Sequence, residues 1–172
     1  MSIPEKRKFT NIQASILKFV KTNFETAYSL SGKINYRDRT FDESKLPQWV
    51  AIDFIGGGAG KKSFSLVQFT VYSKIGGRLS TGDRYGDAMN ILVDKLHNAM
   101  HVDSIPVYDY STKASPVIIA KAKVIVRNSN GKLREPESVD ELEPDVDGVI
   151  STAVTYRFEF IGDLSRAVAY YD

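Results

Sequence analysis

Two long β-patterned runs near the C-terminal end constrain the fold of this chain more than any other feature. The first spans residues 116–127 and the second spans residues 149–161. Apolar and polar side chains alternate in both runs, which is typical of strands that bury one face. The residues expected on the buried faces are Ile118, Ala120, Ala122, Val124 and Val126, and Ile150, Thr152, Val154, Tyr156, Phe158 and Phe160. Because the two strands follow one another, we expect them to pair as an antiparallel ladder.

The segment between the two strands, residues 128–148, differs in charge from the rest of the chain. It holds two bases and seven acids, so its net charge is 2 − 7 = −5, while the whole chain carries +2 and the remainder therefore about +7. One interpretation is a loop that its charges keep solvated. The other is a contact or repulsion surface at the end of a projecting hairpin. The residues of this candidate protein-interaction loop are Lys132, Arg134, Glu135, Glu137, Asp140, Glu141, Glu143, Asp145 and Asp147.

Apolar residues at helical spacing predict two main helices. The first should span residues 10–28, since Thr10 and Gln13 have the spacing of a capping box, and residues 1–9 would then form an N-terminal extension. The second should span residues 84–100. His97 and His101 lie four residues apart near its end, but the chain has no third histidine and no Glu after His97. We therefore predict no metal site there.

Shorter runs predict further strands at residues 34–36, 49–55, 64–73 and 105–110. Pro106 favours either an edge position for the last of them or a place at the start of that strand. The pattern of residues 64–73 changes parity, which predicts a bulge or burial on both faces. Together these elements predict one α+β domain over residues 1–172. Its mostly antiparallel sheet carries the two helices on one face and extends into a long projecting C-terminal hairpin, and residues 162–172 form a tail that either docks or stays mobile.

A glycine-rich stretch, residues 56–63, partly resembles a phosphate-binding loop. Such a loop needs glycine where Ile55 stands and a hydroxyl where Lys62 stands, and a helix must follow it, whereas a strand pattern follows here. The stretch is better explained as a flexible contact turn of a hairpin. The residues of that turn are Gly57, Gly58, Lys61 and Lys62.

Composition narrows the classes of function. The chain has no cysteine, which excludes disulfides, thiolate metal sites and a cysteine nucleophile. No run reaches the roughly 18 apolar residues that span a membrane, and a net charge of +2 does not by itself imply nucleic-acid binding. No pair of carboxylates and no serine stands in a catalytic context. We expect a protein that is not an enzyme and uses no cofactor.

The predicted order of elements, helix–strand–strand–helix–strand–strand–strand, resembles that of the tail terminator proteins of long, non-contractile-tailed bacteriophages. Residues 83–92, 105–107 and 155–160 carry the resemblance. It implies an assembly protein that forms a ring, usually a hexamer, on the tail tube and stops the tube from growing. The implied partners are further copies of the chain, the tail tube protein and a neck or head-completion protein, with DNA passing through the lumen without specific binding. The implied location is the head-proximal end of the virion tail, after assembly in the host cytoplasm.

Other functions remain open at this stage. The chain could be a tail tube or head–tail connector subunit, an adaptor or DNA-binding module, or a nucleotide-binding enzyme that uses residues 56–63. For a ring, the acidic loop and the basic remainder would supply two different complementary patches on each subunit. Alternatively, acidic loops that face the lumen would keep passing DNA from binding.

Overall fold

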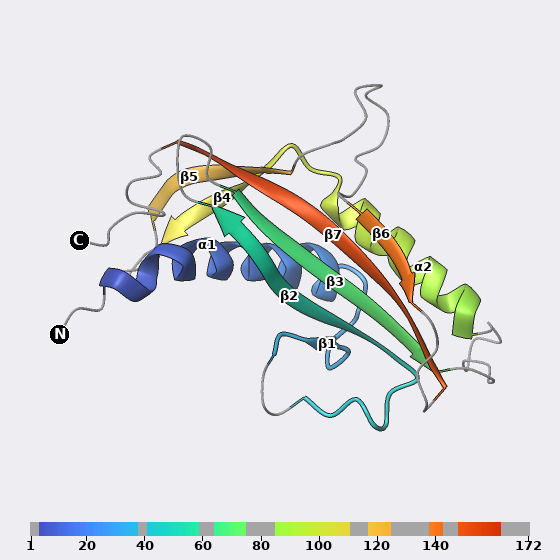
Figure 1. Cartoon of the computed structure of the whole chain (residues 1–172). Coiled ribbons are helices and arrows are strands. Elements are labelled where there is room, and N and C mark those ends of the chain that lie inside the picture. The colour runs from blue at the N-terminus through green and yellow to red at the C-terminus, as the bar shows by residue number, and fades with distance from the viewer. Residues whose placement is uncertain are drawn as a thin grey trace, which may run out of the picture.

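The structure, a computed structural model, describes residues 4–37, 41–58, 64–74, 85–110, 117–124, 138–142 and 148–162. Its helices are α1 (Pro4–Val20), the π-helical turn η1 (Lys21–Thr26) and α2 (Tyr85–Met100). Its strands are β1 (Ile34–Asn35), β2 (Gln48–Gly58), β3 (Phe64–Lys74), β4 (Ser104–Asp109), β5 (Val117–Val124), β6 (Ser138–Leu142) and β7 (Val149–Gly162). This α+β arrangement confirms the predicted class, and Figure 1 shows the sheet curling in front of the helices.

The strands form one mixed sheet in the order β1–β2–β3–β7–β5–β4, with β6 also paired to β7. Only β1 and β2 run parallel, so the sheet is mostly antiparallel as predicted. Strand β7 holds the sheet together. One of its sides pairs with β3, and its other side pairs with β6 near its start and with β5 near its end. The predicted antiparallel pairing of the two long C-terminal runs is therefore confirmed.

One face of the sheet carries the core. Register places Ile52 of β2, Phe69 of β3 and Val154 of β7 side by side, and all three are buried. The helices contribute to the same apolar cluster. Their buried residues in it include Ile12, Ile16 and Val20 from α1, Phe24 from η1, and Met89, Leu92, Leu96 and Met100 from α2. Both helices thus bury an apolar stripe in a single core against one face, because residues three and four apart share one side of a helix.

The first helix begins earlier than the capping box at Thr10 and Gln13 predicts. It starts at Pro4, so most of the expected N-terminal extension is helical. Proline suits a first helical position, because its fixed φ is helical and its missing N–H would have no partner there. The helix also changes form before it ends, since residues 21–26 make a π-helical turn. At this change Asn23 Nδ2 donates to the Phe19 carbonyl oxygen at 3.1 Å.

Two bulges alter the predicted strand faces. The register of β2 against β3 shifts between Phe54 and Gly56, so the predicted irregularity lies in β2, opposite the parity change of β3. The register of β4 against β5 shifts between Val107 and Tyr108, which pair with Ala120 and Ile118. An extra residue reverses the parity of a strand. Ile118 was therefore wrongly predicted to be buried; it is 56% exposed.

The acidic segment is not a loop throughout, as we had expected. Residues 138–142 form β6, which pairs with Ser151 to Thr155 of β7. Strands β5 and β6 both run antiparallel to β7 on the same side, so β6 continues the line of β5 after the intervening residues 125–137. The remainder of the predicted projecting hairpin, residues 125–137 and 143–147, lies outside the described residues, as does the tail from residue 163.

Candidate protein–protein interface

The two ends of the sheet differ in how much of their outer edge is available for pairing with a further strand. Strand β4 lies at one end, as Pro106 predicts, and the short strand β1 lies beside β2 at the other. An exposed strand edge presents unpaired N–H and C=O groups that can pair with another chain. The backbone groups that already have a partner decide how far each edge is available.

The β4 edge is closed by helix α1. The Tyr108 N–H donates to Ser15 Oγ at 2.9 Å, and the Tyr110 N–H donates to Asn11 Oδ1 at 3.0 Å. Pro106 has the same parity in the strand and has no N–H to offer. Three successive outward positions of this edge are thus unable to donate to a neighbouring strand. We refer to β4 with Asn11 and Ser15 as the closed edge.

Asn11 and Ser15 are themselves firmly held. Both are buried, at 0% and 2% exposure. Asn11 Nδ2 donates to Asp109 Oδ1 at 3.3 Å, and Ser15 Oγ donates to the Asn11 carbonyl oxygen at 2.7 Å. The sequence analysis did not identify this pair. The sequence feature that could have identified the pair is two polar residues four positions apart, each directly before an isoleucine of the buried stripe of the helix.

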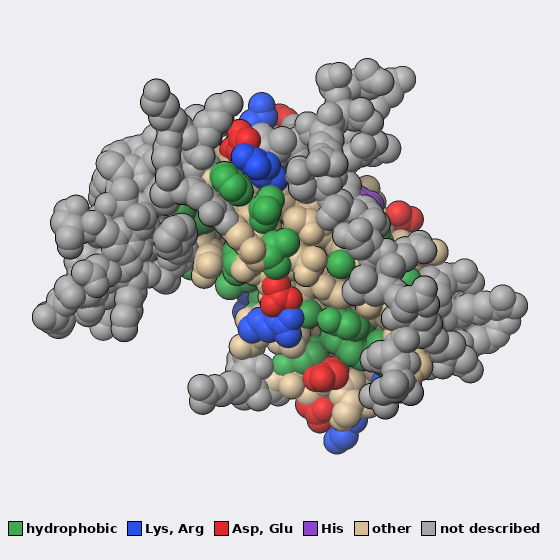
Figure 2. Space-filling model, viewed as in Figure 1, with side chains coloured by type: hydrophobic (Ala, Val, Ile, Leu, Met, Phe, Trp, Pro, Cys, Tyr) green, Lys and Arg blue, Asp and Glu red, His purple; other side chains and the backbone are tan. Residues whose placement is uncertain are grey.

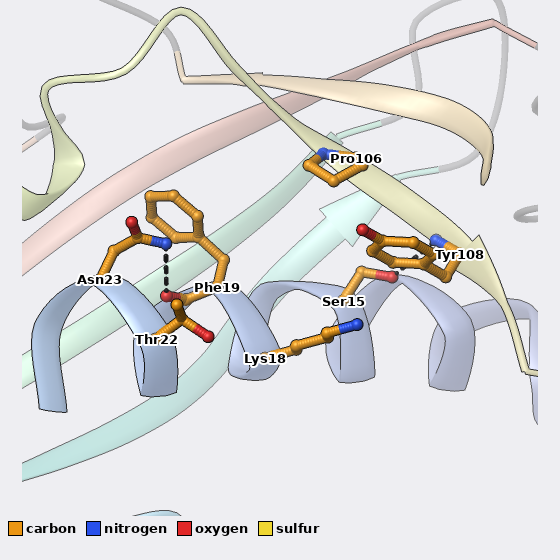
Figure 3. A pocket seen from close by; sticks show the side chains of 7 residues that line it. All are labelled: Ser15, Lys18, Phe19, Thr22, Asn23, Pro106 and Tyr108. Atoms are coloured by element: carbon orange, nitrogen blue, oxygen red, sulfur yellow. Dashed lines mark hydrogen bonds between the residues drawn. The ribbon is translucent and has the colours of Figure 1, made fainter. Parts of the chain in front are cut away.

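A pocket of about 210 Å³ lies between α1–η1 and β4, beside the closed edge (Figure 3). Its walls include Phe19, Pro106 and Tyr108, and Lys18 Nζ lies 4.3 Å from the centroid of the Tyr108 ring. This volume is below the roughly 300–1,000 Å³ of typical small-molecule sites. None of the described residues that line the pocket is an acid.

The β2 edge is open over its second half. Strand β1 pairs only with Val50 and Ala51, where the Val50 N–H donates to the Lys33 carbonyl oxygen at 2.9 Å. Within the described residues, no strand pairs with residues 53–58 on the side away from β3. Ile55, at the bulge of this stretch, is 49% exposed. We refer to residues 53–58 as the open β2 edge.

The predicted contact turn is partly contained in the open β2 edge. Gly57 and Gly58 are its last residues and pair with Ser65 and Phe64 of β3. Their antiparallel pairing confirms a hairpin, and strand β3 follows where a phosphate-binding loop would need a helix. The lysines of the turn, Lys61 and Lys62, lie outside the described residues.

The acidic candidate residues are placed only in part. Asp140 and Glu141 lie on β6, in register with Ala153 and Thr152 of β7. In the described part of the chain, no strand pairs with β6 on its other side, which we refer to as the β6 edge. The remaining members of the candidate loop fall outside the described ranges; they are Lys132, Arg134, Glu135, Glu137, Glu143, Asp145 and Asp147. The described members of the two candidate sets lie apart, because β3 and β7 separate the end of β2 from β6.

The face of the sheet opposite the helices is built of cross-strand pairs. Trp49 of β2 and Tyr72 of β3 stack with ring centroids 5.0 Å apart. Arg37 Nε donates to Asp53 Oδ1 at 2.7 Å, and this hydrogen bond raises the pKa of the Arg37 guanidinium. Figure 2 shows charged side chains interspersed with hydrophobic ones on this face. Such pairs stabilise a sheet face, and the described helices pack against the other one.

The two histidines do not form a metal site in the described structure. His97 Nδ1 lies 2.5 Å from Tyr156 Oη, so its ring is occupied by a hydrogen bond to the core of the sheet. Burial lowers the pKa of His97 and raises that of Tyr156. His101 is exposed. Among the described residues, no group of three or more His, Asp or Glu is arranged to hold a metal ion.

Two further findings concern the apolar character of the described helices and the similarity of the chain to known proteins. None of those helices combines the length and apolar character that a membrane span requires. Comparison of the chain with protein-family models and with curated proteins found no match to either.

Proposed function

We propose that this chain is a bacteriophage tail terminator, a virion assembly protein that caps the tail tube as a ring. The ring ends polymerisation of the tube and offers a docking surface to the neck or head. Its partners are copies of itself, most simply as a hexamer, together with the tail tube protein and a neck or head-completion protein. DNA passes through the lumen.

The observation that carries the proposal is the order of elements. The resemblance rests on helix–strand–strand–helix–strand–strand–strand, and the described elements follow that order once the two short strands β1 and β6 are set aside. They build one sheet with both helices in a single core on one face. The open β2 edge and the β6 edge remain for contacts with other subunits.

A ring needs two different patches on each subunit that fit one another. The open β2 edge and the β6 edge lie on opposite sides of the β3–β7 pair, so one subunit has two separate surfaces to offer. The net charge of −5 in residues 128–148, which include β6, against about +7 elsewhere gives the chain two regions of opposite charge. This arrangement supports head-to-tail association of identical subunits.

Tail assembly tests the proposal directly. Removal of the gene from its phage should give tails of uncontrolled length in electron micrographs, because nothing would stop the tube from growing. A tail tube subunit would behave differently, since its removal should leave no tubes. Tails of normal length in the deletion would refute both assignments.

Purified protein supplies an independent test. Light scattering should show a closed assembly several times the 19.2 kDa subunit mass, with a fixed upper size. Tubes that grow with protein concentration would instead indicate a tail tube subunit. Rising salt should dissociate the ring if opposite charges hold it together, because exposed charges are screened within roughly 10 Å at 0.1 M salt.

A further inference from the structure

We propose that the pocket between α1–η1 and β4 binds a small monocarboxylic acid whose apolar body is the size of a single benzene ring. This inference goes beyond the proposed function and does not depend on it, because the site lies within one subunit. The described lining residues come from two parts of the chain, residues 15–23 of the helical segment and residues 106–108 of β4. The fold brings these parts together along the closed edge.

The volume of the pocket sets the size of the ligand. That volume is about 210 Å³. An apolar cavity of roughly 150 Å³ already binds benzene, whereas drug-sized ligands occupy roughly 300–1,000 Å³. The pocket therefore has room for one ring and a short acidic substituent, and it is too small for a nucleotide.

Apolar side chains surround the middle of the pocket. Figure 3 shows the rings of Phe19 and Tyr108 at its two ends, with Pro106 of β4 between them. Phe19 and Tyr108 are partly exposed, so an apolar ligand would remove surface of both rings from water. An aromatic ligand would also find two rings to contact.

A positive charge lies at the Tyr108 end of the pocket. Lys18 Nζ is 4.3 Å from the centroid of the Tyr108 ring, and the Lys18 side chain is exposed. No ion pair in the described part of the chain involves Lys18, and no described lining residue is an acid. An anionic group on the ligand would supply the missing counter-charge, since an ammonium and a carboxylate form a strong hydrogen bond.

The polar groups beside the ammonium favour a ligand that accepts hydrogen bonds. Ser15 Oγ already donates to the Asn11 carbonyl oxygen at 2.7 Å and accepts the Tyr108 N–H at 2.9 Å. Figure 3 shows the Tyr108 hydroxyl directed along α1 toward Phe19, where it can donate to a ligand. Lys18 is the single base among the described lining residues. The pocket thus matches the one negative charge of a carboxylate better than the larger charge of a phosphate monoester.

The π-helical turn η1 provides an independent observation at the Phe19 end. Thr22 and Asn23 of this turn line the pocket, and Asn23 Nδ2 donates to the Phe19 carbonyl oxygen at 3.1 Å. This hydrogen bond holds the Asn23 side chain beside Phe19. Turns of this kind are rare and occur frequently at functional sites. The helix therefore changes form at the same place where the pocket lies.

An NMR titration with phenylacetate tests the proposal, because this acid combines one ring with one carboxylate. It should bind with a dissociation constant of about 1 mM, as expected of a ligand this small. The amide signals that shift should belong to residues 15–23 and 106–108. Phenylacetamide has the same ring without the charge and should bind about fivefold more weakly. Phenethylamine, a cation, should bind more weakly still.

Two pairs of variants assign the charge to Lys18. Lys18→Gln should weaken binding of phenylacetate about fivefold and leave phenylacetamide unchanged, because both changes remove the same ion pair. Lys95→Gln is the matched control. Lys95 Nζ also lies over a tyrosine ring, 5.8 Å from the centroid of Tyr28, but outside the pocket. Tyr108→Phe should weaken binding about threefold through the lost hydroxyl, and Tyr28→Phe should have no effect.

Several results would overturn the proposal. They are equal affinity of the native protein for phenylacetate and phenylacetamide, a difference that persists in Lys18→Gln, and no shift in residues 15–23 at about 10 mM phenylacetate, roughly ten times the expected dissociation constant. A capped phenylalanyl-aspartate dipeptide presents the ring and the carboxylate as parts of a chain. Tighter binding of this dipeptide than of phenylacetate would assign the pocket to a partner protein instead. None of these outcomes affects the ring, which tail length and mass in solution test separately.

Discussion

Replacing Asn11 with alanine should destabilise the fold and open the closed edge. The change removes Oδ1, which accepts the Tyr110 N–H, and Nδ2, which donates to the Asp109 carboxylate. Alanine keeps the helix, because it has the highest helix propensity of all residues. Any loss of stability therefore reports the contact between α1 and β4 rather than the helix itself.

The size of the expected loss of stability follows from how deeply Asn11 and its partners are buried. Asn11 is fully buried and Asp109 is 8% exposed, so water reaches neither site easily. Removing one hydrogen-bond partner from a buried polar group costs about 1–3 kcal/mol. Tyr110 is partly exposed, which lets water replace part of what its N–H loses. We expect the free energy of unfolding to fall by about 2–3 kcal/mol, a large share of the roughly 5–15 kcal/mol of a typical domain.

Urea denaturation followed by circular dichroism measures this loss. The midpoint should fall by about 1 M urea while the slope stays unchanged, since the surface exposed on unfolding is nearly the same. Asn23→Ala is the control, because Asn23 is an exposed asparagine of the same helical segment and should cost under about 1 kcal/mol. An Asn11→Ala midpoint within error of the native one would show that the edge closes without Asn11. The same variant should also associate more at high concentration, as its β4 edge regains a free donor.

Three further outcomes follow from buried and strained positions. Because burial lowers the pKa of His97 below its ordinary 6.5, the unfolded chain binds the proton more readily, so stability should be complete above about pH 6.5 and fall as the pH drops below it. His97→Gln should remove most of that pH dependence in denaturation curves, and His101→Gln at an exposed site should keep it. Gly148→Ala should lower the free energy of unfolding by about 1–2 kcal/mol, because Gly148 has a φ of +72°. Gly56→Ala is the control and should be nearly neutral in the same assay, because a Cβ added there meets only Leu66 Cδ1 at 3.7 Å. Phe69→Ala should cost about 3–5 kcal/mol through the cavity it leaves beside Tyr156, and a smaller loss would show that the core collapses into the space.

Elements with a sustained period were predictable from the sequence. The alternation in residues 149–161 identified β7 and its buried face, and the helical spacing after Arg84 identified α2. In α2 the local pattern and the final burial agree, whereas β7 is buried on both faces, since Ser151, Ala153 and Thr155 on the side predicted to be polar are buried too. Strand β6 could not be identified in this way, because five residues with two acids carry little strand preference and the segment is a strand where β7 provides a ladder.

The bulges and the candidate interface could not be predicted from the sequence, because both depend on which residues pair in three dimensions. Periodicity reveals a parity change but not which of two paired strands holds the extra residue, so the exposure of Ile118 was missed. The candidate residues Asp140 and Glu141 were identified by charge, yet their position on a strand edge follows only from pairing with β7. Closure of the β4 edge needs Asn11 and Tyr110, which lie 99 residues apart in sequence. No local signal reports a contact of that kind.

The central position of β7 has a consequence for the order in which this chain can fold during synthesis. Strands β2 and β3 pair with each other, and β4 and β5 pair with each other, but only β7 joins the two pairs into one sheet. Until β7 has been synthesised, the nascent chain has two hairpins that no described strand joins into one sheet. Such intermediates expose apolar surface and unpaired edges. The common sheet must therefore form after β7 has been synthesised, and a chain that stops before Val149 should be a substrate for chaperones and proteases rather than a smaller folded domain.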